Sequence, residues 1–192
     1  FLAAGALTKN EGLLFAAATY VSLLVLATGR RRAVGVSAGV VALVVAPWRA
    51  YITIHDIRAP DYDLSSSFDL PLVAERLDRI PPAAEGLLHE MRDPAQFGLL
   101  LTLAVAATVV AFVFAPRRLA LLAAGFGLLS FAGLTWIYVV ATNDVDFFLR
   151  TNANRVVVSL VLGLAALTPL LVEESVRGLA SRKRNPVAGG TR

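Results

Sequence analysis

Long uncharged stretches dominate the pattern of hydrophobic and polar positions along the chain. The five longest have 16 to 25 residues each and are separated by charged residues: 12–29, 33–48, 94–116, 119–143 and 156–172. A helix that crosses a bilayer needs roughly 20 largely apolar residues, because the hydrocarbon core is about 30 Å thick. The pattern predicts an all-α integral membrane protein with about five transmembrane helices, at residues 12–29, 33–54, 96–116, 119–141 and 156–172.

The composition of the chain agrees with this pattern. Hydrophobic residues make up 57% of the 192 positions and charged residues 17%, with a mean hydropathy of +0.68. Soluble domains carry about 25% charged residues, so a soluble enzyme and a DNA-binding domain are excluded. The net charge of +4 is therefore attributed to basic cytoplasmic loops, and no nucleic-acid partner is expected. The absence of Cys excludes disulfides and thiolate metal sites.

Basic residues gather in three of the segments that border the apolar runs. They are Arg30–Arg32, Arg117–Arg118 and, after the last run, Arg177, Arg182, Lys183 and Arg184. Cytoplasmic loops are enriched in Arg and Lys. We therefore expect a multi-pass protein of the cell membrane, with a basic cytoplasmic tail at residues 173–192. The loop at residues 55–95 and a turn at about residues 142–155 then face outward.

The first residues of the chain are apolar and lack a basic flank. A secretory signal peptide would show a charged segment, a short apolar core and a cleavage site, and Phe1–Leu7 shows no such order. We expect the chain to be the C-terminal part of a longer protein, whose N-terminal half packs beside these helices.

Short helices are predicted within the outer loop, which holds nine acidic residues and four Arg between residues 55 and 95. Asp69 can cap a helix in which Pro71 takes an early position, and a second helix follows Pro81–Pro82. Their apolar faces comprise Leu72, Val73, Leu77 and Ile80 in the first, and Leu87, Leu88 and Met91 in the second. Two amphipathic helices on the outer membrane surface fit this pattern, and packing on neighbouring loops of the missing N-terminal half fits it equally well.

The predicted outer ends of the spans carry aromatic and charged side chains. The aromatic residues match an interfacial belt: Trp48, Tyr51, Trp136 and Tyr138. Ionisable groups are costly in a bilayer, so those near span ends are candidates for binding: Lys9, Glu11, Arg49, Arg150 and Arg155. Their structural alternatives are helix capping, snorkelling to the interface and loop solvation. In the functional interpretation the cations bind an anionic lipid headgroup, and a guanidinium suits bidentate phosphate binding.

Two acidic pairs raise the question of a metal ion. Asp61-Tyr62-Asp63 spells the Asp-x-Asp pattern with which sugar-nucleotide transferases hold a divalent cation, and an acidic loop also produces this pattern by chance. Asp144 and Asp146 in the predicted outer turn are the second pair, for which loop solvation is the favoured interpretation. No metal ligand or cofactor is assigned, and a divalent cation stays open.

Four fragments of the chain resemble polytopic membrane glycosyltransferases of the GT-C type, in that family's order. This group includes the family 39-like protein O-mannosyltransferases and the lipid A aminoarabinose transferases. Leu7-Thr8-Lys9-Asn10-Glu11-Gly12 is similar to a Thr-Lys-x-x-Gly element, and Ala46-Pro47-Trp48-Arg49 to a Pro-Trp element. Residues 87–100 resemble a surface helix that leads into a span. Thr151-Asn152-Ala153-Asn154-Arg155 resembles a Thr-Ser-Ala-Asp-Arg element before a last span.

The resemblance implies an enzyme that transfers a sugar from a polyprenyl-phosphate donor, on the outer side of the membrane, to an acceptor that the sequence leaves open. The lipid phosphate is then the leaving group, cationic side chains stabilise its growing charge, and a carboxylate serves as base. The residues assigned to substrate binding on this basis are Lys9, Glu11, Trp48, Arg49, Arg150, Asn154 and Arg155.

The chain also departs from the family. The family's catalytic acid lies in an early outer loop that has no counterpart here, so no residue of this fragment is assigned a catalytic role and the fragment by itself is expected to be inactive. Asn154 stands where an Asp is common. The alternatives are a transporter or lipid flippase and a non-catalytic membrane subunit. The five apolar runs carry their charges at the ends, whereas transport pathways often place them in mid-span.

Overall fold

Every regular element in the described part of the chain is a helix. The structure is a computed structural model that describes residues 10–26, 29–55, 57 and 69–184, and these residues contain no strand. In chain order the elements are α2 (Asn10–Leu26), α3 (Arg31–Ile54), α4 (Leu70–Glu75), the 3₁₀ turn η2 (Leu77–Arg79), α5 (Ile80–Met91), α6 (Gly98–Phe114), α7 (Arg117–Val140) and α8 (Val145–Arg184). The all-α prediction is confirmed.

Three of these helices are long and apolar enough to cross a membrane. They are α3, α7 and α8, the last over Val145–Arg182. The apolar helices α2 and α6 have 17 residues each, which corresponds to about 26 Å of helix and is shorter than the roughly 30 Å of a hydrocarbon core. The described residues thus contain fewer helices of full membrane-spanning length than the five predicted.

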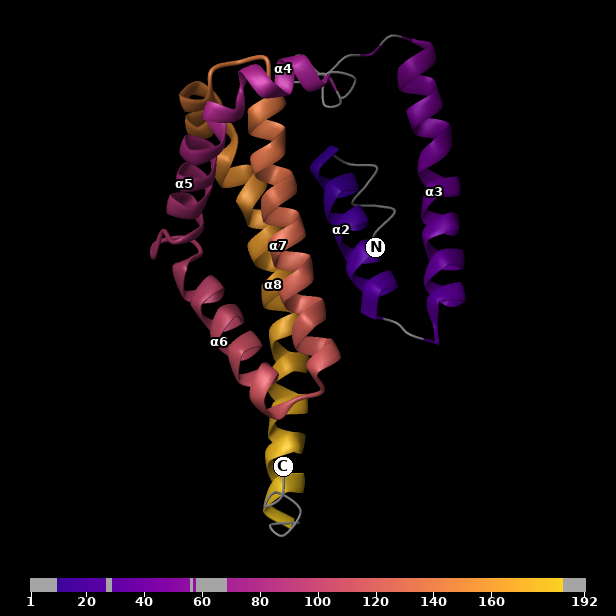
Figure 1. The fold of residues 1–192 in the computed structure, drawn as a ribbon, viewed down its shortest axis with the longest axis vertical. Coiled ribbons are helices and arrows are strands. Elements are labelled where there is room, and N and C mark those ends of the chain that lie inside the picture. Colours follow the sequence, from indigo (N-terminus) through magenta and orange to yellow (C-terminus); the bar gives the residue numbers. More distant parts are fainter. Residues whose placement is uncertain (1–9, 27–28, 56, 58–68, 185–192) are drawn as a thin grey trace.

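The helices form an elongated bundle with one outlying member (Figure 1). α8 packs against α5, α6 and α7, α2 packs along α7, and α3 stands beyond α2 at the edge of the molecule. A large core lies among α2, α5, α7 and α8 and includes Leu87, Leu134 and Leu160. A second core is rich in alanine and joins α6, α7 and α8. Small side chains allow close approach of helices in this core, as is common in membrane bundles.

Helix α8 is longer at both ends than the sequence pattern indicates. The predicted turn at about residues 142–155 is too long: only residues 141–144 connect α7 to α8, and α8 begins at Val145 and includes the Thr151–Arg155 element. Asp144 begins this helix by accepting a hydrogen bond from the Asp146 amide at 2.9 Å. The polar segment can stay helical because residues 145–162 contain no Gly or Pro. The Thr151 hydroxyl is satisfied within the helix, since it donates to the Phe147 carbonyl at 2.9 Å.

The basic tail is also helical as far as Arg184. Residues 173–192 were predicted as a basic cytoplasmic tail, and the part up to Arg184 continues α8 past the apolar run. Arg177 forms ion pairs with Glu173 at 2.6 Å and Glu174 at 2.8 Å, which lie one turn earlier. The Arg182 guanidinium donates to the Val113 carbonyl at 2.8 Å, so the tail also holds the end of α6.

The two short helices predicted in the outer loop correspond to α4 and α5, but the first is shorter than predicted. Leu77 lies in η2 and Ile80 begins α5, and both side chains are exposed instead of completing the predicted apolar face. Asp69 caps α4 by accepting from the Leu72 amide at 3.5 Å, and prolines occupy the first turn of each helix. The apolar face of α5 packs into the main core, where Ala83, Leu87 and Met91 are buried. The face of α5 thus packs on α7 and α8 of this chain, an environment that neither of the two predictions named.

Tyr138 does not belong to an interfacial aromatic belt, contrary to the prediction. Its side chain is 0% exposed and makes an edge-to-face contact with Phe148, at 4.9 Å between ring centroids. The other three aromatic residues of the predicted belt, Trp48, Tyr51 and Trp136, are 38–49% exposed. Tyr138 faces inward because the start of α8 folds back against the end of α7.

Candidate functional site

A groove of about 410 Å³ lies between α2 and α3 and includes the predicted site residue Arg49 in its lining. It is called the α2–α3 groove below, and its lining is apolar apart from Tyr20 and Arg49: Leu13, Ala16, Ala17, Tyr20, Ala38, Val41, Ala42, Val45, Ala46 and Arg49. Five of these ten side chains are alanine, which keeps the space between the two helices open. Apolar walls of this kind favour a hydrocarbon chain over a polar ligand.

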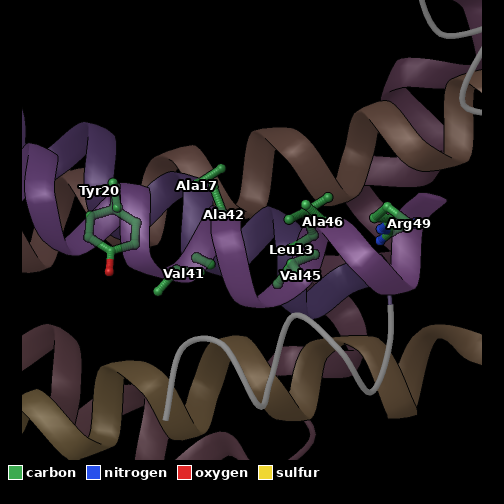
Figure 2. A pocket seen from close by; sticks show the side chains of 10 residues that line it. Leu13, Ala17, Tyr20, Val41, Ala42, Val45, Ala46 and Arg49 are labelled. Atoms are coloured by element: carbon green, nitrogen blue, oxygen red, sulfur yellow. The ribbon is translucent and has the colours of Figure 1, made fainter. Parts of the chain in front are cut away.

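The two ends of the groove differ in chemistry. Figure 2 shows Tyr20 at one end of the row of lining residues and Arg49 at the other. At the first end the Tyr20 hydroxyl forms a hydrogen bond with the Ser37 hydroxyl at 2.9 Å, which ties α2 to α3. The second end carries a positive charge. The groove thus combines a long apolar surface with one terminal cation.

The Arg49 side chain is incompletely satisfied by the rest of the protein. Its Nε atom is buried and has no hydrogen-bond partner in the described part of the chain. Among the same residues, Arg49 forms no ion pair. A buried guanidinium N–H without an acceptor is costly. An anion at the end of the groove would supply that acceptor.

Aromatic rings lie beside Arg49 on α3. Trp48 and Tyr51 stack with 5.8 Å between ring centroids and an interplanar angle of 13°, and Tyr51 lies 4.4 Å from the His55 ring. Trp48 is 44% exposed. The stack gives the end of α3 a flat, accessible face with the predicted substrate-binding residue Trp48 in it.

Glu11 occupies the first turn of α2 and is half-buried. A carboxylate there is favoured by the positive end of the helix. Glu11 and Glu90 of α5 both interact electrostatically with Tyr138, so the three residues lie in one region where α2, α5 and α7 meet. The Tyr138 hydroxyl is buried without a hydrogen-bond partner among the described residues. The sequence does not reveal this buried hydroxyl, because Tyr138 lies near the predicted outer end of the apolar run at residues 119–143, where a Tyr is typical of an interfacial belt.

The predicted site residues of α8 lie outside the groove. Arg150, Asn154 and Arg155 are exposed on α8, and the Asn154 amide donates to the Gln96 side chain before α6. No α8 residue lines the α2–α3 groove. Of the predicted site residues that the structure describes, Arg49 therefore lines the groove, Trp48 precedes it in the chain without lining it, and the α8 group lies outside it.

Two of the predicted elements fall outside the described residues. Lys9 is one, and the Asp61–Asp63 pair is the other. The Asp144 carboxylate accepts from the start of α8, as given above, so a structural role accounts for it. Within the described ranges no group of three or more His, Asp or Glu residues is placed to hold a metal ion.

Comparison with known proteins gives no assignment. The chain matches no protein-family model, no curated protein and no solved structure. The resemblance to GT-C glycosyltransferases therefore stays a prediction.

Proposed function

We propose that this chain is the C-terminal part of a GT-C-type membrane glycosyltransferase, which moves a sugar from a polyprenyl-phosphate donor to an acceptor on the outer face of the cell membrane. The α2–α3 groove is the observation that carries the proposal. Its apolar lining fits a prenyl chain, and Arg49 at its end fits the phosphate that joins lipid and sugar.

In this proposal Arg49 acts on the leaving group. Breaking the bond between sugar and phosphate leaves negative charge on the lipid phosphate, and a fixed guanidinium lowers the energy of that charge in a water-poor site. Trp48 and its stacked neighbour Tyr51 offer a ring face to the sugar. The other substrate-binding residues of the proposal are Lys9, Glu11, Arg150, Asn154 and Arg155, and the catalytic base comes from the N-terminal half of the protein.

The proposed topology has five membrane crossings with the C-terminus in the cytoplasm. α2 and α6 complete the set by crossing where the bilayer thins locally, which costs only fractions of a kcal/mol per Å of mismatch. This topology places Arg49, the start of α2 and the start of α8 on the outer side.

Photolabelling with a diazirine-bearing polyprenyl phosphate tests the lipid site in membranes that contain the full chain. We expect cross-links on the residues that line the α2–α3 groove. Arg49→Ala should weaken labelling by roughly tenfold to a hundredfold, since a hydrogen bond to a charged group contributes about 1.5–3 kcal/mol. Ala42→Trp should block labelling by filling the groove. Arg32→Ala, an exposed position at the opposite end of α3, is the matched control and should change nothing.

The outcomes separate the alternatives. A structural subunit gives no groove labelling, and labelling that is unchanged in Arg49→Ala and Ala42→Trp overturns the lipid site. The complete protein is then assayed for transfer from a polyprenyl-phosphate sugar. Labelling without transfer supports the flippase alternative, whereas transfer that Arg49→Ala reduces supports the enzyme.

A further inference from the structure

Two arginines from the segment after α4 converge on the end of α7. Arg76 donates through Nη1 to the carbonyl oxygens of Val140 at 3.3 Å and Ala141 at 2.9 Å. Arg79 donates through Nη1 to Ala141 at 3.0 Å and to Asn143 at 3.3 Å. Both guanidinium groups thus share one acceptor, the Ala141 carbonyl oxygen. Figure 1 shows α4 lying across this end of α7.

Helix capping accounts for only part of this arrangement. The C-terminus of a helix carries the equivalent of about half a negative charge, whereas the two arginines bring two positive charges. The described residues supply no ion-pair partner to either arginine. The side chains are half-buried, so water screens their mutual repulsion only in part. The carboxylates of the same segment, Glu75 and Asp78, are exposed and form no ion pair with the two guanidinium groups, so these groups are left without a charged partner among the described residues.

The unused donors of the two arginines form a defined binding edge. A guanidinium has five N–H donors in a fixed plane. The four hydrogen bonds described above all use Nη1, and no hydrogen bond from Nε or Nη2 of either residue is formed with the rest of the described chain. The Nε and Nη2 donors lie side by side and match two oxygens of a phosphate.

The position of the pair indicates the source of the phosphate. α7 has 24 residues and is long and apolar enough to cross a membrane, and the arginines sit at its last carbonyls. The end of a membrane-crossing helix lies at the depth of lipid headgroups. We infer that Arg76 and Arg79 form a site for the phosphate of an anionic membrane lipid. This site is separate from the α2–α3 groove, and the inference does not depend on the proposed glycosyltransferase function.

Lipid binding to the purified full chain tests this site, with native mass spectrometry in neutral detergent as the readout. We expect phosphatidylglycerol to bind more tightly than phosphatidylcholine, whose choline cation is repelled by the two guanidinium groups. Arg76→Gln and Arg79→Gln, each alone, leave one arginine on Ala141 and so preserve the cap. Each should weaken phosphatidylglycerol binding about tenfold, the loss expected from a charge-assisted hydrogen bond. Arg92→Gln makes the same charge change at an exposed position directly after α5. It should leave phosphatidylglycerol binding within twofold of wild type.

Competition with inorganic phosphate distinguishes a lipid headgroup from a free phosphate ion as the ligand of the two arginines. Retention of phosphatidylglycerol in excess inorganic phosphate assigns the site to a lipid headgroup, as proposed. Displacement by inorganic phosphate overturns the lipid assignment in favour of a free phosphate site. Equal binding of the two lipids, or wild-type binding in both Gln variants, shows that the arginines serve only as a helix cap and overturns the inference.

Discussion

Helices α3 and α7 have the same length and similar hydropathy, yet they have opposite surroundings. Each has 24 residues, with a mean hydropathy of 1.6 in the most apolar part of α3 and 1.8 in that of α7. Of that part, 6% is buried by protein in α3 and 33% in α7. Hydropathy thus reports that both helices avoid water, and it does not report what each helix touches.

The small residues of the two regions show the same difference. Gly35 and Gly39 of α3 have open space where a Cβ would lie, whereas the glycines of α7 and α8 face side chains or backbone of neighbouring helices. We call α6, α7 and α8 the packed bundle. Its stability depends on contacts between helices, while α3 is held mainly by α2. Substitutions of matched type in the two regions should therefore have different effects.

The largest difference is expected for leucine truncation. Leu134 of α7 is 0% exposed and Leu43 of α3 is 74% exposed. Leu134→Ala leaves a cavity in the main core and should lower the free energy of unfolding by about 2–5 kcal/mol. Leu43→Ala should change it by less than about 0.5 kcal/mol. Unfolding of the full chain by sodium dodecyl sulfate in mixed micelles measures both, and equal effects would contradict the contrast between α3 and α7.

Glycine substitution should give effects of opposite sign. A Cβ at Gly178 of α8 would overlap the carbonyl oxygen of Phe114, which is backbone and yields little. Gly178→Ala should destabilise the packed bundle by about 1–3 kcal/mol. Gly39→Ala meets nothing within 4 Å and should stabilise α3 by about 0.5–1 kcal/mol through helix propensity. The same titration tests this pair, and a stabilising Gly178→Ala would show that α6 and α8 lie farther apart.

The smallest effect concerns a single arginine at the end of the packed bundle. Besides its hydrogen bond to Val113, the Arg182 guanidinium lies 5.4 Å from the centre of the Phe114 ring. Arg182→Ala should cost about 0.5–1 kcal/mol, because both contacts are largely exposed to solvent. Arg32→Ala at the start of α3 is the control, since Arg32 is exposed, and should stay within about 0.3 kcal/mol. Amide hydrogen exchange at the end of α6 would show where the stability is lost, and unchanged exchange there would contradict this prediction.

Local signals in the sequence determined most of the helical segments, though not the two ends of α8. Each apolar run overlaps one helix of the described residues. The Asp69 cap and the early prolines predicted the starts of α4 and α5, because capping and helix geometry depend on residues within one turn. Arg49 could be selected as a candidate from its place near the end of a run. The α2–α3 groove could not be foreseen, since it depends on alanines of two helices lying opposite each other.

Contacts between distant residues decided the rest. Arg76 and Arg79 reach carbonyls 62 to 65 positions away in the chain, and Tyr138 is buried because α8 returns along α7. α8 runs past its apolar stretch partly because Gly178 and Arg182 rest on the end of α6. The periodicity and hydropathy of a sequence describe how a single helix interacts with its solvent, and they do not describe its contacts with other helices. Which face of a helix meets protein follows from how several helices fill space together, because packing is a property of pairs of surfaces.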